Sequence, residues 1–209
     1  MSASFYIAVE DDLSDAVARK LLDHVRRGFQ VKARYPLPAF PHLRPELSGY
    51  GYLRTNVRAF NMAAAQTPHL LLTDLDIAAC APQLIQEWFG SSLHPNFLLR
   101  VAVREVETWL LADAANIAVF LRLTPNHIPA SVETVANPKE EIVRLAGIST
   151  DSEVQQNLVP RPGSTAKTGR LFNRSLIGYV RDLWDIDAAA ANADSLARAL
   201  RALRTFRPT

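Results

Sequence analysis

The chain has 209 residues, of which 48% are hydrophobic and 21% are charged, and its formal net charge is +2. This composition is typical of a folded globular protein and excludes a disordered or collagen-like chain. The length suits one domain with an appendage, or two very small domains.

The sequence gives no sign of export or membrane insertion. No apolar run approaches the roughly 20 residues of a membrane span. The segment that follows Met1 turns acidic at Glu10 and lacks the basic start of a signal peptide. A single cysteine, Cys80, can form neither an internal disulfide nor a zinc cluster. We therefore expect a cytoplasmic protein with no membrane partner.

Strand-like and helix-like segments alternate along the first half of the chain. Helical spacing of apolar residues begins near residue 13, where Asp12 or Ser14 could cap a helix, and Gly28 could end it. Prolines between 36 and 45 predict a long irregular loop. Short apolar runs predict strands at 5–9, 30–35, 69–73 and 97–103, with helices at 13–25, 53–65, 82–89 and 104–112.

This alternation predicts an α/β fold with a mostly parallel sheet and helices on both faces. After residue 113 no convincing strand pattern follows. Apolar periodicity there predicts helices at 138–146, 171–184 and 194–204, with a looser stretch at 151–167. We therefore expect an α/β domain over residues 1–112 and a helical appendage packed on it over residues 113–209.

Charge is unevenly distributed. Residues 68–90 carry three acids and no base, whereas two other segments are basic. A site that holds a metal on carboxylates and a phosphate chain on arginines needs such segregation. The alternative is that these segments are ordinary solvated surfaces. The basic residues are Lys32, Arg34, Arg44, Arg54 and Arg58 in 29–66, and Arg161, Lys167, Arg170, Arg174 and Arg181 in 154–181.

Acidic residues follow three of the predicted strands. Glu10 follows the first strand, Asp74 and Asp76 follow the third, and Glu105 and Glu107 follow the fourth. Ligands of open α/β sheets bind beyond the carboxyl ends of the strands, and an Asp-x-Asp pair in extended chain points both carboxylates to one side. Grouped carboxylates suit Mg²⁺ or Mn²⁺. The alternative is that these acids cap the helices that follow.

These motifs resemble a known family. A glutamate that closes the first strand and an Asp-x-Asp that closes a later one resemble the TOPRIM domain of topoisomerases, primases and overcoming-lysogenization-defect nucleases. The chain is also similar to a small bacterial TOPRIM-like family of unknown function, whose members are often encoded beside an ABC-type ATPase. The segments that carry this similarity include 49–53, 104–107 and 137–140. It differs from that family at Arg104, where the family has histidine. It also lacks the usual TOPRIM glycine near the first glutamate, since Asp11 and Asp12 follow Glu10 instead.

The resemblance implies a TOPRIM-like sheet and a metal-dependent nuclease that acts on DNA or RNA, with a role in phage defence beside an ATPase partner. In this reading Glu10, Asp74 and Asp76 hold Mg²⁺ or Mn²⁺. The predicted catalytic residues are Glu105, Glu107 and Lys167, and the predicted contacts to the nucleic-acid backbone are Arg54, Arg58, Lys167 and Arg170.

The alternative function is a non-catalytic subunit. In that reading the sheet is a scaffold, the acids bind a structural ion or none, and the helical half docks onto an ABC-type ATPase. The stretch from Gly163 to Lys167 either binds phosphate or is an ordinary linker, because it only partly matches a nucleotide-binding loop.

Overall fold

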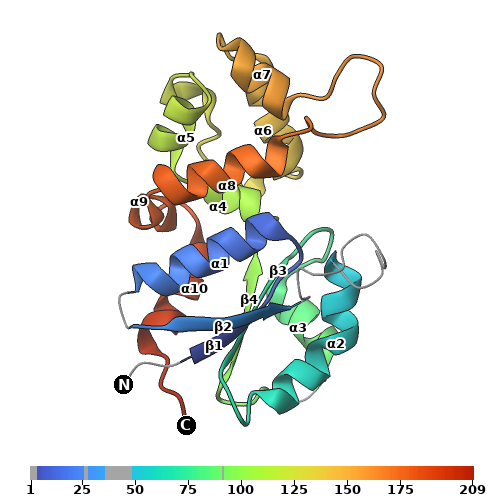
Figure 1. Cartoon of the computed structure of the whole chain (residues 1–209), viewed down its shortest axis with the longest axis vertical. Coiled ribbons are helices and arrows are strands. Elements are labelled where there is room, and N and C mark those ends of the chain that lie inside the picture. The colour runs from blue at the N-terminus through green and yellow to red at the C-terminus, as the bar shows by residue number, and fades with distance from the viewer. Residues whose placement is uncertain (1–3, 26–27, 36–48, 91) are drawn as a thin grey trace. The chain divides into compact units, whose positions relative to one another are not determined.

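The structure is a computed structural model, which describes residues 4–25, 28–35, 49–90 and 92–209. The chain divides into two compact units (Figure 1). The sheet unit consists of Met1–Val103 with Arg198–Thr209, and the helical unit consists of Arg104–Ala197. The predicted proline-rich loop and Arg44 lie outside the described residues.

The sheet unit is built on four parallel strands in the order β2-β1-β3-β4. The strands are β1 (Ser4–Ala8), β2 (Gln30–Tyr35), β3 (His69–Asp74) and β4 (Phe97–Ala102). Each lies within about one residue of the segment that its apolar run predicts. The predicted α/β fold with a parallel sheet is therefore confirmed.

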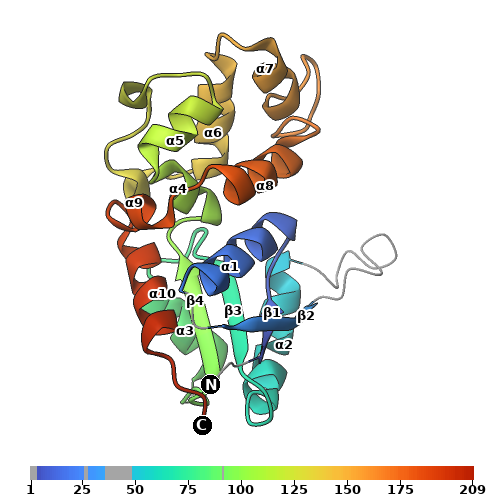
Figure 2. The same ribbon diagram turned by 60° about the vertical axis from the view of Figure 1, so that its left-hand side comes forward.

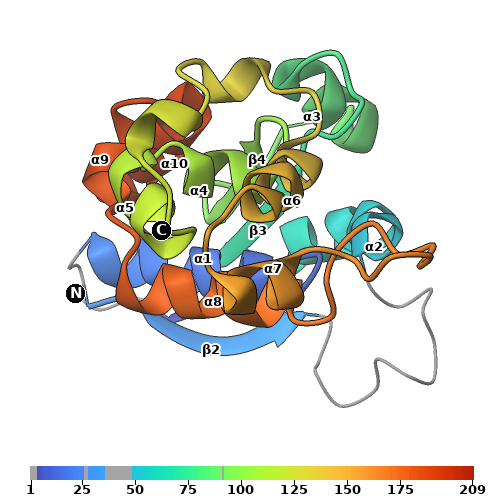
Figure 3. The ribbon, with the colours of Figure 1, turned by 90° about the horizontal axis from the view of Figure 1, so that it is seen from above.

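Three helices connect the strands and cover both faces of the sheet: α1 (Asp12–His24), α2 (Gly49–Ala63) and α3 (Ala81–Phe89). Side chains from α2 and α3, such as Leu53 and Trp88, share one core with Leu71 and Leu99 of the strands. Figures 2 and 3 show α1 on the opposite side of the sheet. Because strand side chains alternate, neighbouring residues of β3 feed both cores.

The start of α1 differs from the prediction. Asp11 caps the helix, and its Oδ1 accepts hydrogen bonds from the backbone nitrogen and the hydroxyl of Ser14, both at 2.8 Å. Asp12 is the first helical residue, and the helix ends at His24, before Gly28. The carboxylate of Asp11 satisfies a backbone donor that would otherwise lack an intrahelical partner.

The helical unit contains helices and turns but no strand, and the sequence predicts none after about residue 113. One prediction here was wrong: residues 152–158, expected to be loose, form a helix capped by Asp151, whose Oδ1 accepts from Glu153 N and Val154 N. The helices are α4 (Val106–Leu111), α5 (Ala114–Phe120), α6 (Pro138–Gly147), α7 (Ser152–Leu158), α8 (Phe172–Asp182), α9 (Ile186–Ala190) and α10 (Asp194–Thr205), which continues into the sheet unit, with short 3₁₀ turns at Pro125–His127 and Val132–Thr134.

A buried aspartate organises the helical unit. Asp113 is 1% exposed, and its Oδ2 accepts hydrogen bonds from Tyr179 OH at 3.2 Å, Asp185 N at 2.8 Å and Asn116 Nδ2 at 2.9 Å. Burial, together with the charge of Asp113, raises the pKa of Tyr179 above its ordinary range. One carboxylate therefore ties α5, α8 and the start of α9 together.

Among the described residues, no helix is long and apolar enough to cross a membrane.

Candidate functional site: acidic residues at the carboxyl end of the sheet

Glu10 links the ends of two neighbouring strands. Its Oε1 accepts a hydrogen bond from Thr73 Oγ1 at 2.6 Å and another from Asp74 N at 3.0 Å. The register of the sheet explains this contact. Ala8 pairs with Leu71, and Glu10 and Thr73 each lie two residues further along, so they are opposite one another on the same face. Glu10 therefore lies at the carboxyl end of the sheet, as predicted.

The backbone around Glu10 is also held from both sides. Val9 N donates to Tyr35 O of β2 at 3.1 Å, and Gly49 N at the start of α2 donates to Glu10 O at 3.2 Å. The position of this carboxylate is therefore set by strands on either side of β1 and by the helix that follows β2.

Asp74 and Asp76 follow the same strand but differ in their surroundings. Asp74 is the last residue of β3 and is half-buried, whereas Asp76 is exposed. Asp76 has φ +48°, in the left-handed region that non-glycine residues rarely adopt. The turn around it is closed by a hydrogen bond from Ala78 N to Leu75 O at 3.0 Å. Strained backbone of this kind is enriched at functional sites.

The electrostatics of Glu10 reflect its crowded position. Burial raises the pKa of the Glu10 carboxyl, and the negative charges of Asp76 and Asp11 raise it further. The hydrogen bonds from Thr73 and Asp74 act in the opposite direction. The negative charges of Asp76 and of the helix cap Asp11 thus both act on Glu10, and a bound cation would offset their effect on this carboxylate.

The donor atoms at this edge suit a hard divalent cation only in part. Carboxylate oxygens are the ligands that Mg²⁺ and Mn²⁺ prefer, and among the described residues Oε2 of Glu10 accepts no hydrogen bond. The described ranges hold no group of three or more histidine, cysteine, aspartate or glutamate side chains arranged to bind a metal. Mg²⁺ commonly takes one or two carboxylates and fills its other positions with water and substrate oxygens. The residues present fit that sparse kind of site.

The other predicted carboxylates lie in the helical unit and meet the start of α6. Glu105 Oε2 accepts a hydrogen bond from Lys139 N at 3.1 Å, and Glu107 Oε1 lies 3.4 Å from Lys139 Nζ. Glu107 is buried, 1% exposed, whereas 37% of the Lys139 side chain is exposed, so water reaches this ion pair from the side of the lysine. Lys167 Nζ lies 3.6 Å from Oε1 of Glu140, the next residue along α6. The structure therefore brings the 104–107 and 137–140 motifs together.

The predicted nucleic-acid contacts fall in two places. Arg54 and Arg58 lie one turn apart on the exposed side of α2, and neither side chain has an ion pair with any described residue. Lys167 and Arg170 belong to the loop before α8, where Arg170 lines a pocket. Arg34, from the same basic segment as Arg54, instead pairs with Asp12 and Asp15 of α1.

Three residues of these sites were missed in the sequence. Thr73 and Asp11 flank the predicted acids, but their roles depend on strand register and on the position of the helix cap. Lys139 lay within a motif that the sequence singled out, yet its contact with Glu105 spans 34 residues of chain. The one sequence signal for the role of Thr73 was the alternation of side chains along a strand, which places Thr73 on the same face of the sheet as Glu10.

No protein-family model, no curated protein and no solved structure matches the chain. The class that the fold and this edge of the sheet define is a parallel four-stranded α/β protein with acidic residues at the carboxyl ends of its inner strands.

Proposed function

We propose that the protein is a divalent-metal-dependent phosphoryl-transfer enzyme of TOPRIM type that cleaves nucleic acid. The observation that carries the proposal is the bond between Glu10 and the end of β3, which joins the two motifs of the family resemblance at one edge of the sheet. In open parallel sheets this edge is where ligands bind.

Glu10 and Asp76 would hold Mg²⁺ or Mn²⁺, with Asp74 beside them at the end of β3. The ion, when bound, supplies charge that polarises a phosphoryl oxygen and lowers the pKa of a bound water. Thr73 orients Glu10 by its hydrogen bond at 2.6 Å. The acids of this edge repel one another, so they favour a cation over a neutral ligand.

A catalytic role for Glu105 and Glu107, which belong to the helical unit, follows from the family resemblance alone. Their contacts with Lys139 fix the position of both side chains. Arg54 and Arg58 would hold the phosphate backbone of DNA or RNA, as would Lys167 and Arg170. An ABC-type ATPase partner and a role in phage defence follow from the family resemblance alone.

The second candidate is the non-catalytic subunit of an ABC-type ATPase complex. It is favoured by the lack of a three-ligand acidic or histidine group among the described residues. In this case the hydrogen bond from Thr73 to Glu10 serves only to stabilise the pairing of β1 with β3.

Metal binding is tested by thermal unfolding with and without millimolar Mn²⁺. The wild-type melting temperature is expected to rise with Mn²⁺, because an ion that binds only the folded state stabilises it. Glu10→Gln is expected to melt higher than wild type without metal. Since the folded-state pKa of Glu10 is raised, its charged form costs stability above pH 4.5, and glutamine removes that cost while it still accepts both hydrogen bonds. The Mn²⁺ shift should be lost in this variant and kept in Glu87→Gln, a control at an exposed glutamate of α3.

Catalysis is tested by incubating DNA and RNA with the protein in Mg²⁺ or Mn²⁺, alone and with any ABC-type ATPase encoded beside its gene. Glu10→Gln and Asp76→Asn should abolish cleavage, and Glu87→Gln should not. Equal cleavage by all variants would contradict the proposed site. Cleavage by none of them, wild type included, would favour the non-catalytic subunit.

A further inference from the structure

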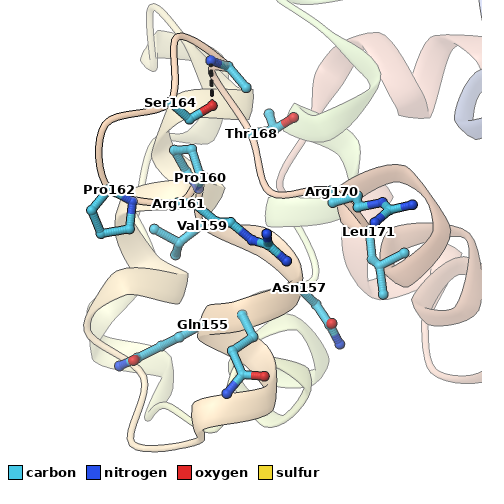
Figure 4. Close-up of a pocket in the computed structure, with 12 residues that line it drawn as sticks. Gln155, Asn157, Val159, Pro160, Arg161, Pro162, Ser164, Thr168, Arg170 and Leu171 are labelled. Atoms are coloured by element: carbon cyan, nitrogen blue, oxygen red, sulfur yellow. Dashed lines mark hydrogen bonds between the residues drawn. The ribbon is translucent and has the colours of Figure 1, made fainter.

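One pocket of the helical unit is formed by a single stretch of chain, residues 155–171 (Figure 4). Its volume is about 1040 Å³, at the upper end of the range for small-molecule sites. The lining combines two guanidinium groups, two hydroxyls and several side-chain amides with proline, valine and leucine. Its polar residues include Gln155, Asn157, Arg161, Ser164, Thr168 and Arg170.

The positive charge of this pocket is not compensated locally. No aspartate or glutamate occurs from residue 154 to residue 181, so none lines the pocket. Arg161 and Arg170 are exposed, and neither guanidinium has a hydrogen bond or an ion pair with any residue that the structure describes. In contrast, Arg144 and Arg122 of the same unit pair with Glu141 and Asp151.

Two backbone hydrogen bonds close the loop that carries these arginines. Gly169 N donates to Leu158 O at 2.8 Å, and Leu171 N donates to Asn157 O at 3.1 Å. We call this pair of bonds the neck. The chain segments approach so closely that a Cβ atom at Gly169 would lie 2.3 Å from Asn157 O. The neck therefore holds the two ends of the loop, one near Arg161 and the other at Arg170, in a fixed relation.

We propose that this pocket binds the phosphate group of a nucleotide. Guanidinium groups form paired, charge-assisted hydrogen bonds with phosphate oxygens, and their own charge is otherwise uncompensated here. Hydroxyls of Ser164 and Thr168 add donors, and the amide of Asn157 offers a donor and acceptor pair of the kind that recognises base edges. Gln155 contributes less, because its Nε2 already donates to Ser149 O at 2.7 Å. A loop closed at a fixed neck loses little conformational entropy when it binds.

The choice of a nucleotide as ligand rests on the proposed function, in which the substrate is nucleic acid. The same phosphate chemistry could come from a free nucleotide or from one nucleotide within a strand. Phosphate recognition by arginines needs no metal ion, so this site can be tested separately from the acidic edge of the sheet.

The test measures fluorescence anisotropy of a labelled 12-nucleotide oligothymidylate in EDTA, with unlabelled thymidine 5′-monophosphate as competitor. Arg161→Gln and Arg170→Gln are each expected to weaken binding about tenfold, the usual effect of losing one charge-assisted contact. The control Arg122→Gln, an arginine that pairs with Asp151 in the same unit, should bind like wild type. Unchanged melting temperatures would show that the variants fold.

Competition by the monophosphate would identify a free nucleotide as a ligand, and binding of the oligonucleotide alone would identify a strand; each supports the proposal. Equal binding by wild type and both arginine variants, or no binding of either probe to wild type, would overturn it. Because EDTA prevents metal-dependent cleavage, binding without any nuclease activity in Mn²⁺ would retain the pocket and reject the proposed function. Metal-dependent cleavage that Glu10→Gln abolishes, together with equal oligonucleotide binding by wild type and both arginine variants, would reject the pocket and retain the proposed metal site.

Discussion

The neck of the 155–171 loop makes a sharp prediction about glycine. In Gly169→Ala the added methyl would lie 2.3 Å from Asn157 O, 2.6 Å from Leu158 C and 2.7 Å from Asn157 C, all backbone atoms that no rotamer change can move. Ordinary contacts begin near 3.4 Å, so the two segments must separate by about 1 Å. That displacement would break both hydrogen bonds of the neck, at 2.8 and 3.1 Å. At about 1 kcal/mol for each bond, we expect a loss of about 2 kcal/mol in the free energy of unfolding.

The matched control is Gly178→Ala. Gly178 lies inside α8, and a Cβ atom there meets no heavy atom within 4 Å. Alanine favours a helix over glycine by up to about 1 kcal/mol, so this variant should be more stable than wild type. Urea unfolding followed by circular dichroism measures both changes, and hydrogen exchange at residues 169 and 171 reports local opening of the neck. A Gly169→Ala protein as stable as wild type, with both amides still protected, would refute the reasoning.

Three further predictions concern buried polar groups. Burial lowers the pKa of His69, whose Nδ1 lies 2.7 Å from Thr67 O, so wild type should lose stability as the pH falls below 6.5. In His69→Asn, which keeps a hydrogen-bond donor at this position, the midpoint of urea unfolding should change less with pH. Asp113→Ala leaves four donors without their acceptor and should cost about 3 kcal/mol in urea unfolding, whereas the exposed Asp182→Ala should cost less than about 0.5 kcal/mol. Arg100 of β4 buries its Nε atom with no hydrogen-bond partner among the described residues. Arg100→Met should therefore raise the free energy of unfolding by about 1 kcal/mol and raise the melting temperature with it. A lower melting temperature would show that the guanidinium stabilises the fold.

The strands were predictable because buried strands have a recognisable apolar composition. Runs such as Leu70–Leu72 are apolar at every position, which is typical of a strand covered on both faces, and helical segments between such strands favour parallel pairing. The order of the strands and the contact of Glu10 with Thr73 depend on tertiary register, which no local pattern records.

The short helices of the helical unit escaped prediction for a related reason. Helices α5, α7 and α9 span only five to seven residues, too few for apolar periodicity to emerge. Each begins after an aspartate, Asp113, Asp151 or Asp185, whose side chain accepts a backbone N–H at the first turn. Caps of this kind were a usable signal, since an aspartate before a weakly apolar segment favours helix initiation.

The return of residues 198–209 to the sheet unit has a consequence for how the chain folds during synthesis. Phe206 packs against Phe5 and Phe29, with its ring 5.2 Å from that of Phe5, so the aromatic cluster at β1 is completed by a residue that is translated long after the strand. The helical unit, in contrast, is contiguous and emerges whole before them. A nascent chain halted near residue 197 would thus leave the aromatic cluster around β1 incomplete, and we expect the sheet to be the late-folding and more chaperone-dependent part of the protein, although its strands are made first.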